Sequence, residues 1–167
     1  MDHPVVLFLL RAIHILASIV WVGGVVLVTL FVIPAARAVG PSGQQMLQHI
    51  MLRAKLSVYL MASAVLTLLA GLALYGRDMS LTEGEWAHSP MGVGITAGAT
   101  CAIVAMVIGM FVTAPAAKRL AGAGAPGAAP LTDDERMRLQ GRLALFTRVV
   151  LALLAIAATL MATARYF

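Results

Sequence analysis

The residues with the most chemical potential in this sequence lie on one stripe of its first apolar segment. Its members are three or four residues apart and therefore share one face of a helix: Arg11, His14, Ser18, Trp21, Val25 and Thr29. They lie within an apolar run over residues 5–36, longer than the roughly 20 residues that cross a bilayer as a helix. Ionisable side chains at membrane depth are costly and usually face a bundle interior, a cavity or a cofactor. The stripe predicts a first helix with a polar inner face.

His14 has the side chain best suited to bind a cofactor at that depth. A neutral imidazole is a common axial ligand of haem iron, and helix-bundle interiors commonly hold such cofactors. Arg11, one turn away, or Arg148 in the last apolar segment could pair with a haem propionate. In the alternative interpretation, His14 only hydrogen-bonds a threonine or a backbone carbonyl of a neighbouring helix. No second histidine lies in an apolar segment, so the sixth ligand would be Met106, Met161, Cys101 or His88, or the iron would have no sixth protein ligand.

Several polar side chains are predicted at the same depth as His14. His14 is roughly 13 Å from the outer end of its helix at 1.5 Å per residue. The same depth along the other segments reaches Thr67, the pair Thr100 and Cys101, and residues 157–159. Glycines near this level let helices approach closely or leave room for a flat ligand. The candidate cofactor-binding residues are therefore His14, Arg11, Ser18, Trp21, Thr67, Thr100, Cys101 and Arg148, with His14 as the metal ligand.

Composition limits the class of protein. The chain has 167 residues, of which 61% are hydrophobic and 11% charged, and its mean hydropathy is +0.94. These values indicate a multi-pass membrane protein with one domain over residues 1–167. The net charge is +5. The basic residues flank the apolar segments and form no patch with interleaved aromatic residues, so no nucleic-acid partner is expected. No nucleotide-binding motif is present, and a single cysteine excludes an intrachain disulfide.

The order of apolar segments predicts an all-α integral membrane four-helix bundle. The expected helices cover about residues 5–36, 45–76, 90–118 and 132–166. Lys and Arg are concentrated in the first and third loops, which places these loops in the cytoplasm and both termini on the outer side. An outer aromatic belt is expected to include Tyr166 and Phe167.

Local signals mark the starts and ends of these helices. Ser42–Gln45 and Thr132–Glu135 both fit the capping box, a hydroxyl followed three residues later by Glu or Gln. Residues 121–130 are almost only Ala, Gly and Pro, which predicts a flexible linker. The first and third helices end alike, at Pro34 and at Pro115, each followed by a basic residue. This similarity indicates a weak internal repeat of two helical hairpins.

Two stretches resemble a known family. The segment Arg11–Gly24, with its His-then-Trp-Gly-Gly pattern, is followed by Leu52–Leu56 and by Leu68–Leu72. Together they resemble the CopD-like superfamily, which includes copper-resistance D membrane domains and HemJ-type protoporphyrinogen oxidases. The resemblance implies a four-helix core in a bacterial inner membrane. For the HemJ branch it also implies a haem-dependent oxidoreductase with haem b bound through His14. The chain departs from that branch over residues 92–97, which contain no histidine or lysine.

The sequence supports one leading hypothesis and two alternatives. The leading hypothesis is a haem b-binding protein of the bacterial inner membrane that transfers electrons or acts as an accessory oxidoreductase. The first alternative is a cofactor-free subunit that packs in the lipid bilayer against a larger membrane complex or, as a homodimer, against a second copy. The second alternative is a copper-handling membrane protein. The ten methionines are scattered and form no short copper-binding motif, so they are expected to fill the core.

Overall fold

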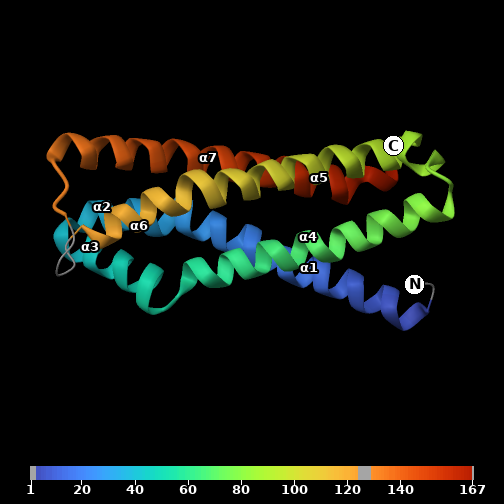
Figure 1. Cartoon of the computed structure of the whole chain (residues 1–167), viewed down its shortest axis with the longest axis horizontal. Helices are drawn as coiled ribbons and strands as arrows, with labels where there is room; N and C mark the ends of the chain where they lie inside the picture. Colours follow the sequence, from blue (N-terminus) through green and yellow to red (C-terminus); the bar gives the residue numbers. More distant parts are fainter. Residues whose placement is uncertain (1–2, 124–128, 167) are drawn as a thin grey trace.

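The computed structural model describes residues 3–123 and 129–166, except for the side chain of Leu52. The described residues are helical and contain no strand (Figure 1). The α-helices are α1 (Pro4–Leu27), α2 (Ile33–Val39), α3 (Pro41–Gln48), α4 (Leu56–Leu81), α5 (Pro90–Ile108), α6 (Ala114–Gly122) and α7 (Asp133–Thr163). Part of the predicted linker, residues 124–128, and Phe167 of the predicted aromatic belt lie outside the described residues.

Short segments of other helical types join or end these helices. Three are π-helical, namely η1 (Val28–Val32), η2 (His49–Arg53) and η4 (Gly109–Thr113). Two are 3-10 helices, namely η3 (Glu85–His88) and η5 (Ala164–Tyr166). Because η1 and η4 connect their neighbours without a turn, α1 continues into α2 and α5 continues into α6 (Figure 1).

Four helices are long and apolar enough to cross a membrane. They are Pro4–Val39, Leu56–Leu81, Pro90–Gly122 and Asp133–Tyr166. This confirms the all-α prediction and the number of candidate spans, and indicates a multi-pass membrane protein. The chain turns back after each of them, so both termini lie at the same end of the molecule (Figure 1). We call this the α4–α5 end; the opposite end, formed by α2, α3, α6 and the start of α7, is the α3–α6 end.

One of the two predicted capping boxes forms. At the start of α7, the Thr132 hydroxyl accepts a hydrogen bond from the Glu135 backbone N–H at 3.2 Å. The Glu135 carboxylate in turn accepts one from the Thr132 N–H at 3.1 Å. The box predicted at Ser42 is wrong, because α3 begins at Pro41, one residue earlier, and has no side-chain cap. Gly40, at a φ of 76°, ends α2 just before it, and proline suits the first turn of a helix.

The predicted second helix is divided in the structure. A single helix over about 45–76 was expected, whereas η2 ends at Arg53 and α4 begins at Leu56. Lys55 between them has a φ of 55°, in the left-handed region, so the chain cannot continue as one helix there. The Ser57 hydroxyl donates to the Met51 carbonyl at 3.2 Å and bridges the break. α4 also extends past the predicted end, to Leu81.

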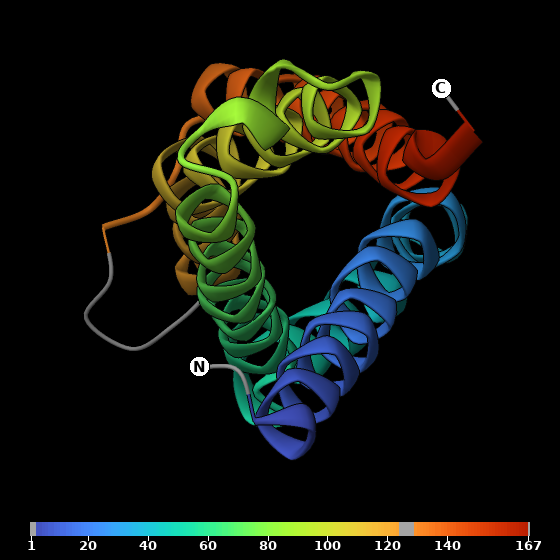
Figure 2. The ribbon, with the colours of Figure 1, turned by 90° about the vertical axis from the view of Figure 1, so that its right-hand side faces the viewer.

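The bundle consists of two helical hairpins. α1 packs mainly on α4, and α5 packs mainly on α7, with fewer contacts between the two pairs. Viewed along the bundle, α1 and α4 form two sides that meet, and α5 and α7 lie across from them (Figure 2). The buried core where all four meet consists mostly of small residues around one tryptophan: Trp21, Ala64, Ala102, Ala105, Val150, Leu154 and Ala157. Such small residues allow close helix packing in a membrane.

The two predicted hairpins share an irregularity. η1 ends at Val32, two residues before Pro34, and η4 ends at Thr113, two residues before Pro115. Within a helix, a proline lacks the N–H donor and clashes with the carbonyl four residues earlier, and a wider π-helical turn relieves that clash. The same device at both places agrees with the internal repeat expected from the sequence.

Candidate functional site

His14 is anchored to the neighbouring helix α4. Its Nδ1 lies 2.8 Å from the Thr67 carbonyl oxygen, and Nδ1–H is the donor because a carbonyl only accepts. The ring rests against Gly71, one turn further along α4. A Cβ at Gly71 would lie 2.8 Å from His14 Cε1 and 2.9 Å from Nδ1, so the ring occupies space that only glycine leaves free.

This hydrogen bond determines the state of the other ring nitrogen. With the proton of a neutral ring on Nδ1, Nε2 carries a free lone pair. Nε2 is also the nitrogen further from α4, at 3.9 Å from the position of a Gly71 Cβ. It makes no hydrogen bond within ranges 3–123 and 129–166. The structure therefore presents an oriented imidazole whose free nitrogen can coordinate a metal.

Of the other predicted site residues that the structure describes, only Thr67 is hydrogen-bonded to His14, through its backbone carbonyl. The buried Thr67 hydroxyl donates to the Ser63 carbonyl at 2.8 Å. Ser18 donates to the Ile15 carbonyl of its own helix at 2.8 Å. Arg11 is exposed, one turn from His14 on the same face. Trp21 is 5% exposed and belongs to the central core.

The remaining three predicted residues lie on the other hairpin. Thr100 is exposed and donates to the Thr96 carbonyl at 2.9 Å. Cys101 packs against the central core. Arg148 is exposed and precedes the core residue Val150, so it lies toward the α3–α6 end of the core. None of the three is hydrogen-bonded to His14 in the described part of the chain.

A metal ion held by protein ligands alone is not supported. Over residues 3–123 and 129–166, no three His, Cys, Asp or Glu side chains are grouped as metal ligands are. A haem differs in this respect, because the porphyrin supplies four of the iron ligands and the protein supplies only the axial ones.

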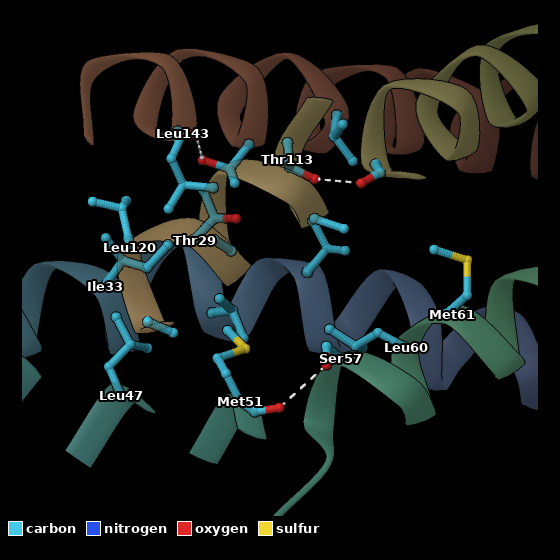
Figure 3. Close-up of a pocket in the computed structure, with 18 of the residues that line it drawn as sticks. Thr29, Ile33, Leu47, Met51, Ser57, Leu60, Met61, Thr113, Leu120 and Leu143 are labelled. Carbon is cyan, nitrogen blue, oxygen red and sulfur yellow. Dashed lines mark hydrogen bonds between the residues drawn. The ribbon is translucent and has the colours of Figure 1, made fainter. Parts of the chain in front are cut away.

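Sequence reasoning missed a cavity on the other side of Trp21. It has a volume of about 230 Å³ and lies between the four long helices toward the α3–α6 end (Figure 3). Its polar lining side chains are Thr29, Arg37, Gln44, Gln48, Ser57, Thr113, Arg136, Gln140 and Thr147. Trp21 lines the end of the cavity that is nearest to His14 along the first helix. His14 itself does not line the cavity. Thr29 was already on the predicted polar stripe, whereas Arg37 and Arg136 were counted only as loop charges and the glutamines were given no role in a site.

The described chain is all-helical, and its four long apolar helices suggest a multi-pass membrane protein. No protein-family model, no curated protein and no solved structure matches this chain.

Proposed function

We propose that this protein binds haem b through His14 and acts in electron transfer or as an accessory oxidoreductase in a bacterial inner membrane. The observation that carries the proposal is the hydrogen bond from His14 Nδ1 to the Thr67 carbonyl. Metal-ligating histidines almost always donate their second ring N–H to a carbonyl, carboxylate or water, which fixes the ring and raises its basicity.

The residues around His14 fit the proximal side of a haem. Thr67 orients the ring, Gly71 gives it room against α4, and Nε2 is left as the donor to iron. Arg11, on the same helix face, is the candidate partner of a propionate. Bound haem would supply one-electron chemistry, and the surrounding apolar helices would set its potential by excluding water.

The location is part of the same proposal. The Lys and Arg of the first and third loops gather at the α3–α6 end, which we assign to the cytoplasm by the positive-inside rule. Both termini and His14 then lie toward the outer side. The likeness of Arg11–Gly24 to the CopD-like superfamily, and to its HemJ branch, supports both haem and a bacterial membrane.

A reduced-minus-oxidised visible spectrum of the purified protein tests the proposal. Cells supplied with haem should yield a protein with a b-type α band, and His14→Ala should lose it. His49→Ala is the matched control, because His49 is an exposed histidine of η2, outside the apolar spans. A featureless spectrum, or a band that survives His14→Ala, would contradict the proposal.

The alternative is a cofactor-free subunit of a larger complex or a homodimer. The same His14–Thr67 bond favours it, since the bond joins α1 to α4 without any ligand. This alternative predicts a colourless protein that associates through its exposed apolar helix faces. Gly98 does not report on that association, because a Cβ there would meet Met161 Cγ at 3.0 Å and the Ala157 carbonyl oxygen at 3.1 Å within the chain. Retained copper without porphyrin absorbance would instead support the copper-handling alternative.

A further inference from the structure

The cavity beyond Trp21 has features of a ligand site that the haem proposal does not use. Its lining changes character along its length. At the α3–α6 end it includes Arg37 and Arg136, and at the opposite end it includes Trp21 and Ala64 of the apolar core. From Arg37 to Trp21 the lining spans about 24 Å of continuous helix at 1.5 Å per residue. The cavity is therefore amphipathic, with a cationic mouth and an apolar floor.

The charge of the lining selects the ligand's head group. Arg37 and Arg136 are its ionised residues, and none of the lining residues is Asp or Glu. Neither arginine forms a salt bridge within the described ranges, which leaves both guanidinium groups available. Arginine is suited to bidentate binding of carboxylates and phosphates. The mouth thus favours an anionic group and disfavours a cation.

Thr29 provides an independent sign that a polar atom enters the cavity. It is 9% exposed, and its hydroxyl makes no hydrogen bond in the part of the chain that the structure describes. Two other lining threonines behave differently, because Thr113 donates to the Gly109 carbonyl at 2.8 Å and Thr147 to the Leu143 carbonyl at 2.7 Å. Thr29 and Leu143 both line the space shown in Figure 3. Because Thr29 lines the cavity and its hydroxyl has no partner in the described ranges, this hydroxyl can donate to a ligand oxygen.

The volume limits the size and shape of the ligand. A volume of about 230 Å³ is several times the roughly 30 Å³ that one water molecule occupies in the liquid, so the cavity can admit an organic ligand. The lining extends along the first helix from Arg37 to Trp21, so a ligand with an extended chain can contact both the charged and the apolar end. From Thr29 to Trp21 the helix axis rises about 12 Å, which suits a chain of comparable length.

We propose that this cavity binds a medium-chain fatty acid, whose extended chain of about ten carbons matches the helix rise of about 12 Å between Thr29 and Trp21. The carboxylate lies at the polar end and is held by Arg37, Arg136 and Thr29, and the chain extends along the apolar lining toward Trp21. The site is separate from His14, so fatty-acid binding does not depend on whether haem is bound.

Fluorescence quenching of Trp21 by 10-bromodecanoate tests this proposal directly, because a bromine at the chain end quenches only a tryptophan that it touches. The protein is placed in lipid nanodiscs and carries Trp86→Phe, which leaves Trp21 as its sole tryptophan. We expect saturable quenching that unlabelled decanoate reverses and that persists in His14→Ala. Simple partitioning into lipid would instead give quenching that rises linearly with ligand concentration and is equal for 10-bromodecanoate and its methyl ester. That result would overturn the proposal.

Variants with matched controls locate the site. Arg37→Gln and Arg136→Gln should each raise the dissociation constant about tenfold, the loss expected for one charge-assisted hydrogen bond. Arg138→Gln is the control and should leave the dissociation constant unchanged, because Arg138 is exposed and outside the lining. Gly109→Leu should abolish saturable quenching, because Gly109 lines the cavity and a Cβ there meets nothing within 4 Å. Gly23→Leu is its control, since Gly23 also has nothing within 4 Å but is exposed and outside the lining.

A third ligand tests whether the site prefers a carboxylate or a phosphate head group. The phosphate monoester 10-bromodecyl phosphate should bind more weakly than the carboxylate, and tighter binding would replace the fatty acid by an alkyl phosphate. If Gly109→Leu does not fold, the two exposed arginine positions still decide the outcome. Equal affinity of Arg37→Gln, Arg136→Gln and Arg138→Gln would refute the proposed head-group site.

Discussion

Replacing Gly71 by alanine perturbs the contact that holds the His14 ring on α4. The added Cβ would lie 2.8 Å from Cε1 and 2.9 Å from Nδ1 of His14, closer than side-chain atoms pack, so the ring must move. The movement breaks or lengthens the 2.8 Å hydrogen bond from Nδ1 to the Thr67 carbonyl. Under the haem proposal, the same movement would also displace Nε2, the nitrogen assigned to the iron.

The expected free-energy change combines three effects. Losing the hydrogen bond costs about 1 kcal/mol. Crowding a packed interface costs about 1–3 kcal/mol when the neighbours can shift only partly. Alanine has a higher helix propensity than glycine, so this part of the change stabilises the protein by about 0.5–1 kcal/mol. Gly71→Ala should therefore destabilise the protein by about 1–3.5 kcal/mol.

Gly76→Ala is the matched control for this change. Gly76 lies in the same helix and is exposed, and a Cβ added there would meet nothing within 4 Å. Its replacement should only gain the helix-propensity term, about 0.5–1 kcal/mol. Thermal unfolding of both variants in the same detergent measures the difference, and the visible spectrum of the haem-loaded protein reports on Nε2. Equal or greater stability of Gly71→Ala than of Gly76→Ala would refute the packing of His14 described above.

Two further predictions concern the ends of helices. Thr132→Ala removes the capping box of α7 and should cost about 1 kcal/mol, with faster amide exchange at Glu135, whose N–H loses its acceptor. Gly43→Ala should separate α2 from α3, because the new Cβ would fall on the backbone of Ala36, which cannot rotate away as a side chain can; we expect a loss of about 1–3 kcal/mol in thermal unfolding.

The predictions for Thr132→Ala and Gly43→Ala each have a control variant. Thr159→Ala removes an exposed hydroxyl that bonds only the Ala155 carbonyl of its own helix, so amide exchange at Glu135 should stay unchanged. Gly141→Ala adds a methyl group where nothing lies within 4 Å and should not destabilise. If Gly141→Ala and Gly43→Ala unfold at the same temperature, the α2–α3 contact does not depend on glycine.

Much of the fold follows from the sequence alone. Long apolar segments must satisfy their backbone hydrogen bonds internally in a bilayer, so each becomes a helix, and four of them were found where hydropathy predicted them. The capping box at Thr132 is equally local, because donor and acceptor are three residues apart. The polar stripe of the first helix was also predictable, since helical periodicity alone puts His14 and Thr29 on one face.

Local signals were insufficient where two of them competed. Ser42 fits a capping box, but Gly40 and Pro41 start the helix one residue before it could act. The break at Lys55 had no marker in the sequence, because lysine is an ordinary helix residue and no glycine or proline stands there.

The partners of the stripe were decided by tertiary structure. Hydropathy does not set the rotation of one apolar helix against another, because lipid and protein interior are similarly apolar. Pairing α1 with α4 is what places His14 against Thr67 and Gly71, and leaves Thr100 and Arg148 on the other hairpin. The cavity likewise exists only because the helices carrying Arg37 and Arg136 come together at the end of the bundle. The sequence determined which side chains are polar, and the packing of the two hairpins decided which of them meet.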